Sequence, residues 1–565
     1  MNGAQMLLEC LKREGVEVIF GYPGGAVLPI FDQLYDFPVR FVLTRHEQAA
    51  AHAADGYARV TGRIGVCLAT SGPGATNLTT GIATAYMDSI PLLAITGQVR
   101  TSLIGVDAFQ EADMTGITRS ITKHNYRVHD ARELCSIVHE ACAICRTGRP
   151  GPVLIDLPVD VQTSKTDPGA TLHACPLSVN DGRAVPDLIL DQAGQMIDCA
   201  AAPVIICGGG VVTASAGPEL RSLAERSMIP VAVTMMGLGG FPGTHPLSLG
   251  MLGMHGTFFA NQAVMAADLI IAVGMRFDDR VTGRIDRFAP RARVIHIDID
   301  PTSIGKNVRC DLPIVGDAKN VLAGLAGRIG RGGSSAAWRR TISDWKRDHP
   351  LTYDRGPGNI KPQYVIEEIY RLTRGKAIIT TEVGQNQMWA TQWYQYDEPR
   401  TFISSGGLGT MGFGLPAAIG AKIGRPDKEV FTIAGDGSIQ MNIQELATCV
   451  NYGLSVKVAI LNNGCLGMVR QWQELFYRKR YSQTVLANPD FVKIAEGYGA
   501  RGIRVSDQRD VPAALAAALA EEQPVFIDFR IDPAENVLPM VPAGESLDKM
   551  MEYGPDDRIK PKEAE

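Results

Sequence analysis

Short runs of apolar residues, many of them β-branched, recur along the whole chain and alternate with amphipathic or alanine-rich stretches. Apolar runs of about four to eight residues are typical of strands buried on both faces of a parallel sheet. The clearest such runs lie at 16–20, 39–43, 64–69, 153–157, 203–207, 294–300, 377–381, 430–434 and 456–461. Strands that alternate with helices predict the α/β fold class, here with mostly parallel sheets flanked by helices.

One strand–helix–strand unit carries the polar residues that are most informative about function. Its strand, glycine-rich turn, helix and second strand are expected at 430–434, 435–438, 442–448 and 456–461. A right-handed crossover makes the two strands parallel, so Asp436 and Asn463 should share the carboxyl edge of one sheet, where open α/β folds bind ligands. Carboxylate and amide oxygens suit Mg²⁺. Gly435 and Gly437 let a phosphate approach the backbone, so the unit predicts a site for a metal-bound phosphate.

The length and the charge narrow the class of protein. At 565 residues the chain is too long for one hydrophobic core, and three domains are the natural count. They are expected at 1–165, 186–330 and 360–535, followed by a tail at 536–565, with linkers at 163–182 and 330–335. The net charge of −5, without a basic run, argues against nucleic acid as a partner. No apolar run is long enough to cross a bilayer and no targeting pattern precedes the first helix, so a cytoplasmic location without a membrane partner is expected.

The 11 cysteines are scattered among the expected strands and helices. Such a distribution predicts reduced, buried thiols rather than a disulfide framework. Cys142 and Cys145 form a C-x-x-C pair, but they lie inside a helical pattern without a second pair. Core packing is therefore expected for them rather than a metal or redox site.

The Gly-Asp-Gly turn followed by an asparagine pair resembles the signature of the thiamine diphosphate (ThDP) enzymes, with Asn463 27 positions after Asp436. A Gly-Asp-Gly sequence alone often marks only a turn, whereas the asparagines after a second strand make the resemblance specific. It implies that Asp436, the side chain of Asn463 and the backbone carbonyl of Cys465 hold Mg²⁺ against the cofactor's diphosphate. The expected domains are then a pyrimidine-binding ThDP domain, a middle domain and a diphosphate-binding ThDP domain.

Glu47 opens an alanine-rich helix after the second expected strand. A glutamate in the first turn of a helix also complements the helix dipole, so the residue by itself leaves a purely structural role open. In ThDP enzymes a glutamate at this place hydrogen-bonds N1′ of the aminopyrimidine ring and favours the tautomer that deprotonates the thiazolium C2. The resemblance implies this catalytic role for Glu47.

Longer stretches at 250–256, 274–283 and 466–473 are similar to the catalytic (large) subunits of the acetohydroxyacid synthase, or acetolactate synthase, family. In that family the middle domain binds FAD, which takes no net redox part in the main reaction. The resemblance implies FAD contacts at Arg149, Gly208, Gly209, Gly210, Thr234, Met236, Leu252, His255, Arg276 and Asp317. The three glycines follow an expected strand, so they equally suit a strand-to-helix turn.

The same resemblance assigns residues around the ThDP and the substrates. Met411 would support the bent cofactor, Arg280 would bind the carboxylate of the second 2-oxo acid, and Trp472 would favour 2-oxobutyrate over pyruvate as acceptor. The remaining assignments are Gly25 and Gln110 as catalytic residues, Phe109 and Met254 at the substrate, and Val383, Gln387, Gly409, Gly437, Ser438 and Met468 at the cofactor. As isolated residues, the Met and the Trp suit a core equally well. The arginine suits an ion pair with Asp278 or Asp279.

The implied enzyme decarboxylates pyruvate and joins the two-carbon unit to pyruvate or 2-oxobutyrate. The products are 2-acetolactate or 2-aceto-2-hydroxybutyrate, on the route to valine, leucine and isoleucine. The implied assembly is a homodimer or dimer of dimers, in which Glu47 of one subunit meets the ThDP of the other, with a separate small regulatory subunit. Val159 stands where many members have lysine, which leaves substrate entry and acceptor choice open.

Two alternative functions remain from the sequence. One is another ThDP and FAD enzyme, such as a pyruvate oxidase or a 2-oxo acid decarboxylase; Arg280 and Trp472 favour carboligation instead. The other is a catalytically inactive paralogue that only binds nucleotides or partners. The joint presence of Glu47, Asp436 and Asn463 argues against the inactive protein.

Overall fold

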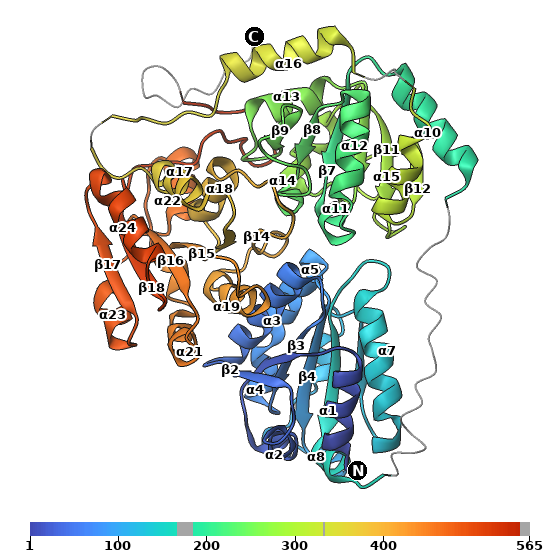
Figure 1. The fold of residues 1–565 in the computed structure, drawn as a ribbon, viewed down its shortest axis with the longest axis vertical. Coiled ribbons are helices and arrows are strands. Elements are labelled where there is room, and N and C mark those ends of the chain that lie inside the picture. The colour runs from blue at the N-terminus through green and yellow to red at the C-terminus, as the bar shows by residue number, and fades with distance from the viewer. Residues whose placement is uncertain (167–184, 331–333, 357, 554–565) are drawn as a thin grey trace.

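The computed structural model describes residues 1–166, 185–330, 334–356 and 358–553. It contains three six-stranded parallel sheets, each flanked by helices. Figure 1 shows the first domain (blue) at the bottom, the middle domain (green) at the upper right and the third domain (orange to red) at the left. The predicted α/β fold class is confirmed, and every strand predicted above is present with small shifts at its ends. Most of the first expected linker, part of the second and the end of the chain lie outside the described residues.

The first sheet has the strand order β2-β1-β3-β4-β6-β5. Its strands are β1 Val18–Gly21, β2 Arg40–Leu43, β3 Gly65–Ala69, β4 Leu92–Gln98, β5 His124–Arg127 and β6 Val153–Pro158. Its helices are α1 Gly3–Arg13, α2 Leu28–Leu34, α3 Glu47–Thr61, α4 Pro73–Asn77, α5 Thr79–Asp88, α6 Met114–Thr118, α7 Leu134–Arg146 and α8 Val159–Thr163. The chain starts in the middle of the sheet and later returns to the other side of β1, so loops at the carboxyl ends of β1 and β3 diverge and leave room for a ligand.

The middle sheet has the order β12-β11-β10-β7-β8-β9, with its topological switch between β7 and β10. Its strands are β7 Pro203–Cys207, β8 Val231–Val233, β9 Ser248–Met251, β10 Leu269–Val273, β11 Arg293–Asp298 and β12 Leu312–Val315. Its helices are α10 Asp187–Cys199, α11 Gly209–Thr213, α12 Gly217–Ser227, α13 Phe258–Ala266, α14 Asp279–Thr282 and α15 Ala318–Ala326, and α16 Ala336–Asp348 follows.

The third sheet, β14-β13-β15-β16-β18-β17, repeats the order of the first sheet strand for strand. Its strands are β13 Ile378–Thr381, β14 Phe402–Ile403, β15 Val430–Gly435, β16 Val456–Asn462, β17 Arg501–Val505 and β18 Val525–Arg530. Its helices are α17 Pro362–Thr373, α18 Gln385–Trp393, α19 Gly414–Gly424, α20 Asp436–Ile439, α21 Leu446–Asn451, α22 Gly467–Phe476, α23 Phe491–Gly497 and α24 Val511–Leu519. Helix α19, which follows β14, is thus the counterpart of α3, which follows β2.

The two counterpart helices pack against each other where the first and third domains meet (Figure 1). A Cβ atom on Gly56 of α3 would lie 2.2 Å from the carbonyl oxygen of Ala417, and one on Gly420 of α19 would lie 1.8 Å from that of Ala53. Only glycine permits such close approach of two helix backbones. One hydrophobic core therefore runs from the first sheet through both helices into the third sheet.

The segment after Asp436 departs from the prediction of one helix at 442–448. It forms the short helix α20, a 3₁₀ turn at Ile443–Glu445 and then α21. Asn442 interrupts the helix because its side chain turns away to donate a hydrogen bond from Nδ2 to the carbonyl oxygen of Gly412 (2.7 Å).

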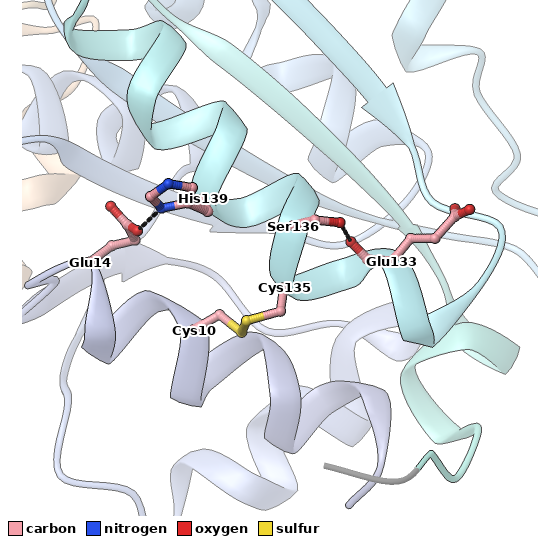
Figure 2. Close-up of a disulfide and its surroundings, with 6 residues drawn as sticks. All are labelled: Cys10, Glu14, Glu133, Cys135, Ser136 and His139. Carbon is pink, nitrogen blue, oxygen red and sulfur yellow. Dashed lines mark hydrogen bonds and ion pairs between the residues drawn. A yellow bond between two sulfur atoms is a disulfide. The ribbon is translucent and has the colours of Figure 1, made fainter. Parts of the chain in front are cut away.

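The expectation of reduced thiols throughout is wrong for one pair. Cys10 of α1 and Cys135 of α7 form a disulfide, drawn in Figure 2 beside the hydrogen-bonded pair of Glu14 and His139. The two helices lie side by side under the sheet and bring the Cα atoms within 5.6 Å, a separation that a disulfide can span. The sequence gives no signal for this pairing, because 125 positions separate the two residues. Cys142 and Cys145 are free and buried, as predicted for core packing.

Candidate functional site

Two of the predicted metal ligands lie at the carboxyl edge of the third sheet. Asp436 follows β15 and Asn463 follows β16, and these strands pair in parallel. The carboxylate of Asp436 is buried and its Oδ2 accepts a hydrogen bond of 2.5 Å from Nδ2 of Asn488. Burial raises the pKa of Asp436 to about 6. Oδ1 of Asn463 accepts a hydrogen bond of 3.2 Å from the backbone N–H of Cys465, so these two predicted ligand residues share one turn, and the backbone N–H of Gly464 in that turn donates to Asp436.

This donor set fits a magnesium ion that is shared with a phosphate. A buried carboxylate is destabilised unless a cation or hydrogen-bond donors face it, and the raised pKa records that strain. One carboxylate, one amide oxygen and one backbone carbonyl are hard oxygen ligands, which Mg²⁺ supplements with water and phosphate. Within the described ranges no group of three or more His, Cys, Asp and Glu side chains is placed to hold a metal.

Two residues that the sequence analysis missed support this edge. Nδ2 of Asn463 donates to Oε1 of Gln385 (3.2 Å), whose Nε2 donates in turn to Oε1 of Gln471 (2.8 Å). Gly467 allows this network, because a Cβ there would lie 2.1 Å from Oε1 of Gln385. Gln385 follows β13, so the rule that polar residues at strand ends form sites could have found it. Asn488 lies in an irregular segment without any periodic signal.

The residues predicted to hold the rest of ThDP surround the loop between β14 and α19. Nε2 of Gln387 donates to Oγ of Ser404 (2.6 Å), and Val383 is the neighbour that a Cβ on Gly409 would meet, at 3.8 Å. Gly409 has a φ of 72°, a left-handed conformation that favours glycine. Met411 follows in the same loop. Gly437 and Ser438 lie in α20, and Met468 lies at the start of α22.

Glu47 lies at the carboxyl edge of the first sheet as the first residue of α3. Its carboxylate is half-buried, and its Oε2 accepts a hydrogen bond of 3.0 Å from Nδ2 of Asn77. A Cβ on Gly74 would approach its Oε1 to 3.0 Å, so the glycine leaves the carboxylate its space. Gly25 lies in a loop at the same edge, where a Cβ would meet no atom within 4 Å.

The third domain fixes the backbone just before Glu47. Oε1 of Glu445 accepts a hydrogen bond from the backbone N–H of Arg45 (2.9 Å), and the hydroxyl of Tyr452 accepts one from Leu43 (2.8 Å). Burial raises the pKa of Glu445 to about 7, although these hydrogen bonds oppose the shift. The loop that positions the predicted catalytic glutamate is therefore anchored in the other ThDP-type domain of the same chain.

The two predicted halves of the ThDP site lie in different domains of the chain, Glu47 in the first and Asp436 in the third. Among the described residues no hydrogen bond joins Glu47 to Asp436, Asn463 or Cys465. The predicted substrate residue Phe109 projects from the first domain with 88% of its surface exposed. The neighbouring Gln110 is also exposed and has a φ of 60°.

The residues predicted to bind FAD lie around the carboxyl ends of the middle strands. Thr234 and Met236 follow β8, Leu252 and His255 follow β9, Arg276 follows β10 and Asp317 follows β12. Gly208, Gly209 and Gly210 follow β7, and a Cβ on the first of them would lie 2.1 Å from the carbonyl oxygen of Gly274. The close packing of two loops at the topological switch therefore accounts for Gly208. Open α/β sheets also bind nucleotides at this switch, so the glycines suit both roles.

Charges and unpartnered atoms at this edge fit a flavin nucleotide. Arg149 donates from Nε to Oγ of Ser89 (2.7 Å) and lies 3.8 Å from the carboxylate of Asp300. Burial and the neighbouring Arg276 lower the pKa of Arg149, so an anion between the two arginines would relieve their repulsion. Nδ1 of His255 is buried without a partner, and burial lowers the pKa of this imidazole to about 4.

Two of the predicted substrate residues, Met254 and Arg280, line a cavity of about 170 Å³ between the middle domain and the tail, and Trp472 does not. Met254 and Arg280 form one wall, and Val541 to Gly544 of the tail form another. The guanidinium of Arg280 is 59% exposed and lies 3.8 Å from Asp279. The structural alternative, an ion pair of Arg280 with Asp279, is thus present, but a pair of this length and exposure stabilises the fold little.

The tail connects this cavity to Trp472. The backbone N–H of Val541 donates to the carbonyl oxygen of Met254 (2.8 Å), while Leu538 and Met540 pack against Trp472 of α22. The tail therefore covers residues of both the middle and the third domain. Val159 is the first residue of α8 and its side chain is half-buried.

Comparison with known proteins places these features in one family. Models of the thiamine pyrophosphate enzymes match the chain three times: the N-terminal TPP binding domain at residues 1–117, the central domain at 190–325 and the C-terminal TPP binding domain at 382–529. The acetolactate synthase large subunit of Parasynechococcus marenigrum is 50% identical over 98% of this chain and 91% of its own length. A probable acetolactate synthase large subunit of Methanocaldococcus jannaschii is 48% identical over 100% and 96%. The large subunit of acetolactate synthase isozyme 3 of Escherichia coli is 47% identical over 97% and 98%.

Proposed function

The chain belongs to the thiamine pyrophosphate enzyme family, among the acetolactate synthase large subunits, and from this premise we propose which residues bind the cofactors and which bind the substrate. It is a ThDP-dependent enzyme that decarboxylates pyruvate and transfers the two-carbon unit to a second 2-oxo acid, in branched-chain amino acid biosynthesis. The observation that carries the assignment of residues is the buried, strained carboxylate of Asp436 beside Asn463 at the switch edge of the third sheet.

The third domain holds the diphosphate end of the cofactor. Asp436, the Asn463 side chain and the Cys465 carbonyl would bind Mg²⁺, and the ion would neutralise the buried carboxylate. Gly409 and Met411 would support the rings from the loop before α19. When bound, ThDP supplies the electron sink that allows a 2-oxo acid to lose CO₂.

Glu47 would hold a proton at N1′ of the aminopyrimidine. Its half-buried position at the sheet edge and its hydrogen bond from Asn77 fix the carboxylate for this contact. No hydrogen bond links the two half-sites among the described residues, and the almost fully exposed ring of Phe109 is a large aromatic surface of the kind that is enriched at protein interfaces. We therefore propose that a second copy completes the site and that the minimum active unit is a homodimer.

The acceptor would bind in the cavity beneath the tail. The planar guanidinium of Arg280 can accept the carboxylate of a 2-oxo acid with two parallel hydrogen bonds. Trp472, held against Leu538 and Met540, would supply an apolar wall beside the substituent of the acceptor.

The proposal also covers a second cofactor in the middle domain, the cellular location and a partner subunit. FAD would bind along the carboxyl edge of the middle sheet, with Arg149 and Arg276 facing its diphosphate. Among the described residues no helix is long and apolar enough to cross a membrane, and we propose a cytoplasmic enzyme. The relatives are named as large subunits, which implies a separate small subunit as partner.

A competition assay with pyruvate and 2-oxobutyrate tests the acceptor assignment. In Trp472→Leu we expect the preference for 2-oxobutyrate to fall about tenfold, because one methylene against an apolar wall is worth about 1–3 kcal/mol. Tyr477→Leu is the matched control, since this exposed aromatic residue follows the last residue of α22. Unchanged preference in Trp472→Leu would remove this residue from the acceptor pocket. Acetyl phosphate or acetaldehyde as the main product from pyruvate would instead indicate an oxidase or a decarboxylase.

A further inference from the structure

The loop at 404–412 between β14 and α19 carries two of the proposed ThDP contacts, Gly409 and Met411. Such a loop needs support, because its glycines leave the backbone many alternative conformations. Gln387 supports it from within the third domain. A second set of contacts comes from the first domain of the same chain, from the ends of α3 and α5.

Asp88, the last residue of α5, binds the loop backbone with both carboxylate oxygens. Oδ1 accepts a hydrogen bond from the N–H of Gly407 (2.7 Å), and Oδ2 accepts one from the N–H of Gly406 (3.0 Å). The side chain has no exposed surface. Charge-assisted hydrogen bonds from backbone amides to a buried carboxylate are strong and directional. A Cβ on Gly407 would lie 2.9 Å from Oδ1, so the loop follows the carboxylate closely.

Arg59 of α3 joins the same carboxylate to the start of the loop. Its Nη2 donates to Oδ2 of Asp88 (2.9 Å) and its Nη1 donates to the carbonyl oxygen of Ser404 (2.9 Å). Its Nε donates to Asp55 one turn earlier (2.5 Å). Burial opposes the charge of the guanidinium, but the two carboxylates outweigh it and raise the pKa of Arg59. The arginine is therefore a fixed cation that orients Asp88.

A third contact fixes the part of the loop beside Met411. The hydroxyls of Thr84 in α5 and Thr410 lie 2.7 Å apart, and the N–H of Thr410 donates to Oγ of Ser405 (3.0 Å). The first domain thus holds the loop at its start, its middle and its end. Since a purely structural ion pair needs no contact with a ligand loop, these contacts point to a positioning role.

We propose that Asp88 and Arg59 are positioning residues for ThDP: they hold the loop 404–412 of their own chain in the conformation that presents Gly409 and Met411 to the cofactor. This inference rests on the proposed ThDP site. It gives the first domain a second role. Besides supplying Glu47, the domain would hold the cofactor-binding loop 404–412 of its own chain in place.

Calorimetric titration of the ThDP-free enzyme with ThDP, at saturating Mg²⁺, tests this proposal. In Asp88→Asn we expect the Kd for ThDP to rise about ten- to a hundredfold, because one backbone amide keeps only a neutral acceptor and the other loses its acceptor altogether. In Thr84→Val, which removes one hydroxyl and preserves the side-chain shape, the Kd should rise several-fold; this variant tests the proposal if Asp88→Asn fails to fold.

Asp156→Asn is the matched control, because Asp156 is a buried carboxylate of the first sheet whose partners are Thr96, Gln98 and Arg127. Its Kd for ThDP should equal that of the wild type. Wild-type affinity in both Asp88→Asn and Thr84→Val, or an equal loss in Asp156→Asn, would overturn the positioning role. If the wild-type chain itself bound no ThDP, the proposed cofactor site would fail, which is a distinct result.

Discussion

Buried acids are the main electrostatic feature of the site at the scale of single residues. Burial raises the pKa of Asp436 to about 6 and those of Glu382 and Glu445 to about 7. Backbone amides compensate Glu382, which accepts a hydrogen bond of 2.6 Å from Gly412. Asp436 is the acid that a bound cation would relieve, and it is the one at the predicted metal site.

Glu445 makes the stability of the chain depend on pH. Because its pKa is raised from 4.5 to about 7, its favourable contribution is fully present below about pH 4.5 and is lost as the pH rises through about 7. We expect Glu445→Gln to remove this dependence, since a glutamine can still accept from Arg45 without ionising. The melting temperature of the variant relative to the wild type should therefore increase from pH 5 to pH 8, by an amount equivalent to a few kcal/mol at most.

The exposed Glu522 provides the control, and Glu522→Gln should track the wild type across this range. A difference between wild type and Glu445→Gln that does not change with pH would contradict the assignment of the raised pKa.

The residues that the sequence predicts for the site mostly follow strands, whereas most of those that it missed do not; Gln385, which follows β13, is the exception. The sequence could predict Asp436, Asn463 and Glu47, because each follows a strand and parallel strands end at one edge of their sheet. Asn488 lies in an irregular segment, and Asp88 lies at the end of a helix in another domain. Their contacts with the site depend on how the domains pack, which no local pattern encodes.

At the scale of elements, the strands were predictable and the helix pairing was not. The buried strands of the parallel sheets are continuous apolar runs, which stand out in the sequence. The contact of α3 with α19 depends instead on small residues, Ala53 and Gly56 in one helix and Ala417 and Gly420 in the other. Each helix places its glycine over the alanine carbonyl of its counterpart, so the pair has an approximate twofold relation.

Gly420→Ala should separate these two helices. The new Cβ would lie 1.8 Å from a backbone oxygen, which cannot move without shifting α3, and we expect destabilisation by about 1–3 kcal/mol. Gly497→Ala in α23 is the control, because a Cβ there meets no atom within 4 Å. Chemical denaturation followed by circular dichroism measures both. Equal stability of the two variants would show that the helices are not in close contact.

The disulfide between α1 and α7 is a second element-scale feature with a measurable effect. A cross-link between residues 125 positions apart restricts the unfolded chain, and removal of such a bond typically costs about 2–4 kcal/mol. We therefore expect Cys10→Ser to lower the unfolding free energy without reductant and to make stability independent of dithiothreitol. Cys199→Ser, at an exposed free cysteine, should behave as the wild type. A wild-type protein that is insensitive to reductant would contradict the bond.

At the scale of the whole molecule, the first and third domains are two copies of one topology joined by one core. The α/β class and the number of domains followed from length and pattern. The shared strand order did not, because the order of strands in a parallel sheet depends on long crossovers whose direction the local sequence leaves open. The repeated topology places Glu47 and Asp436 at the carboxyl edges of two different sheets, one in the first and one in the third domain.

This arrangement makes the shared site the central claim: Glu47 of one copy acts on the cofactor held by Asp436 of another. The most direct test is a mixed dimer of differently tagged Glu47→Gln and Asp436→Asn chains, isolated by both tags and assayed for acetolactate formation beside the two inactive parents. If each site takes one residue from each chain, the mixed dimer contains one intact site and should show about half the wild-type activity. Activity no higher than that of the parents would contradict the account, because it would place both residues of every site in the same chain.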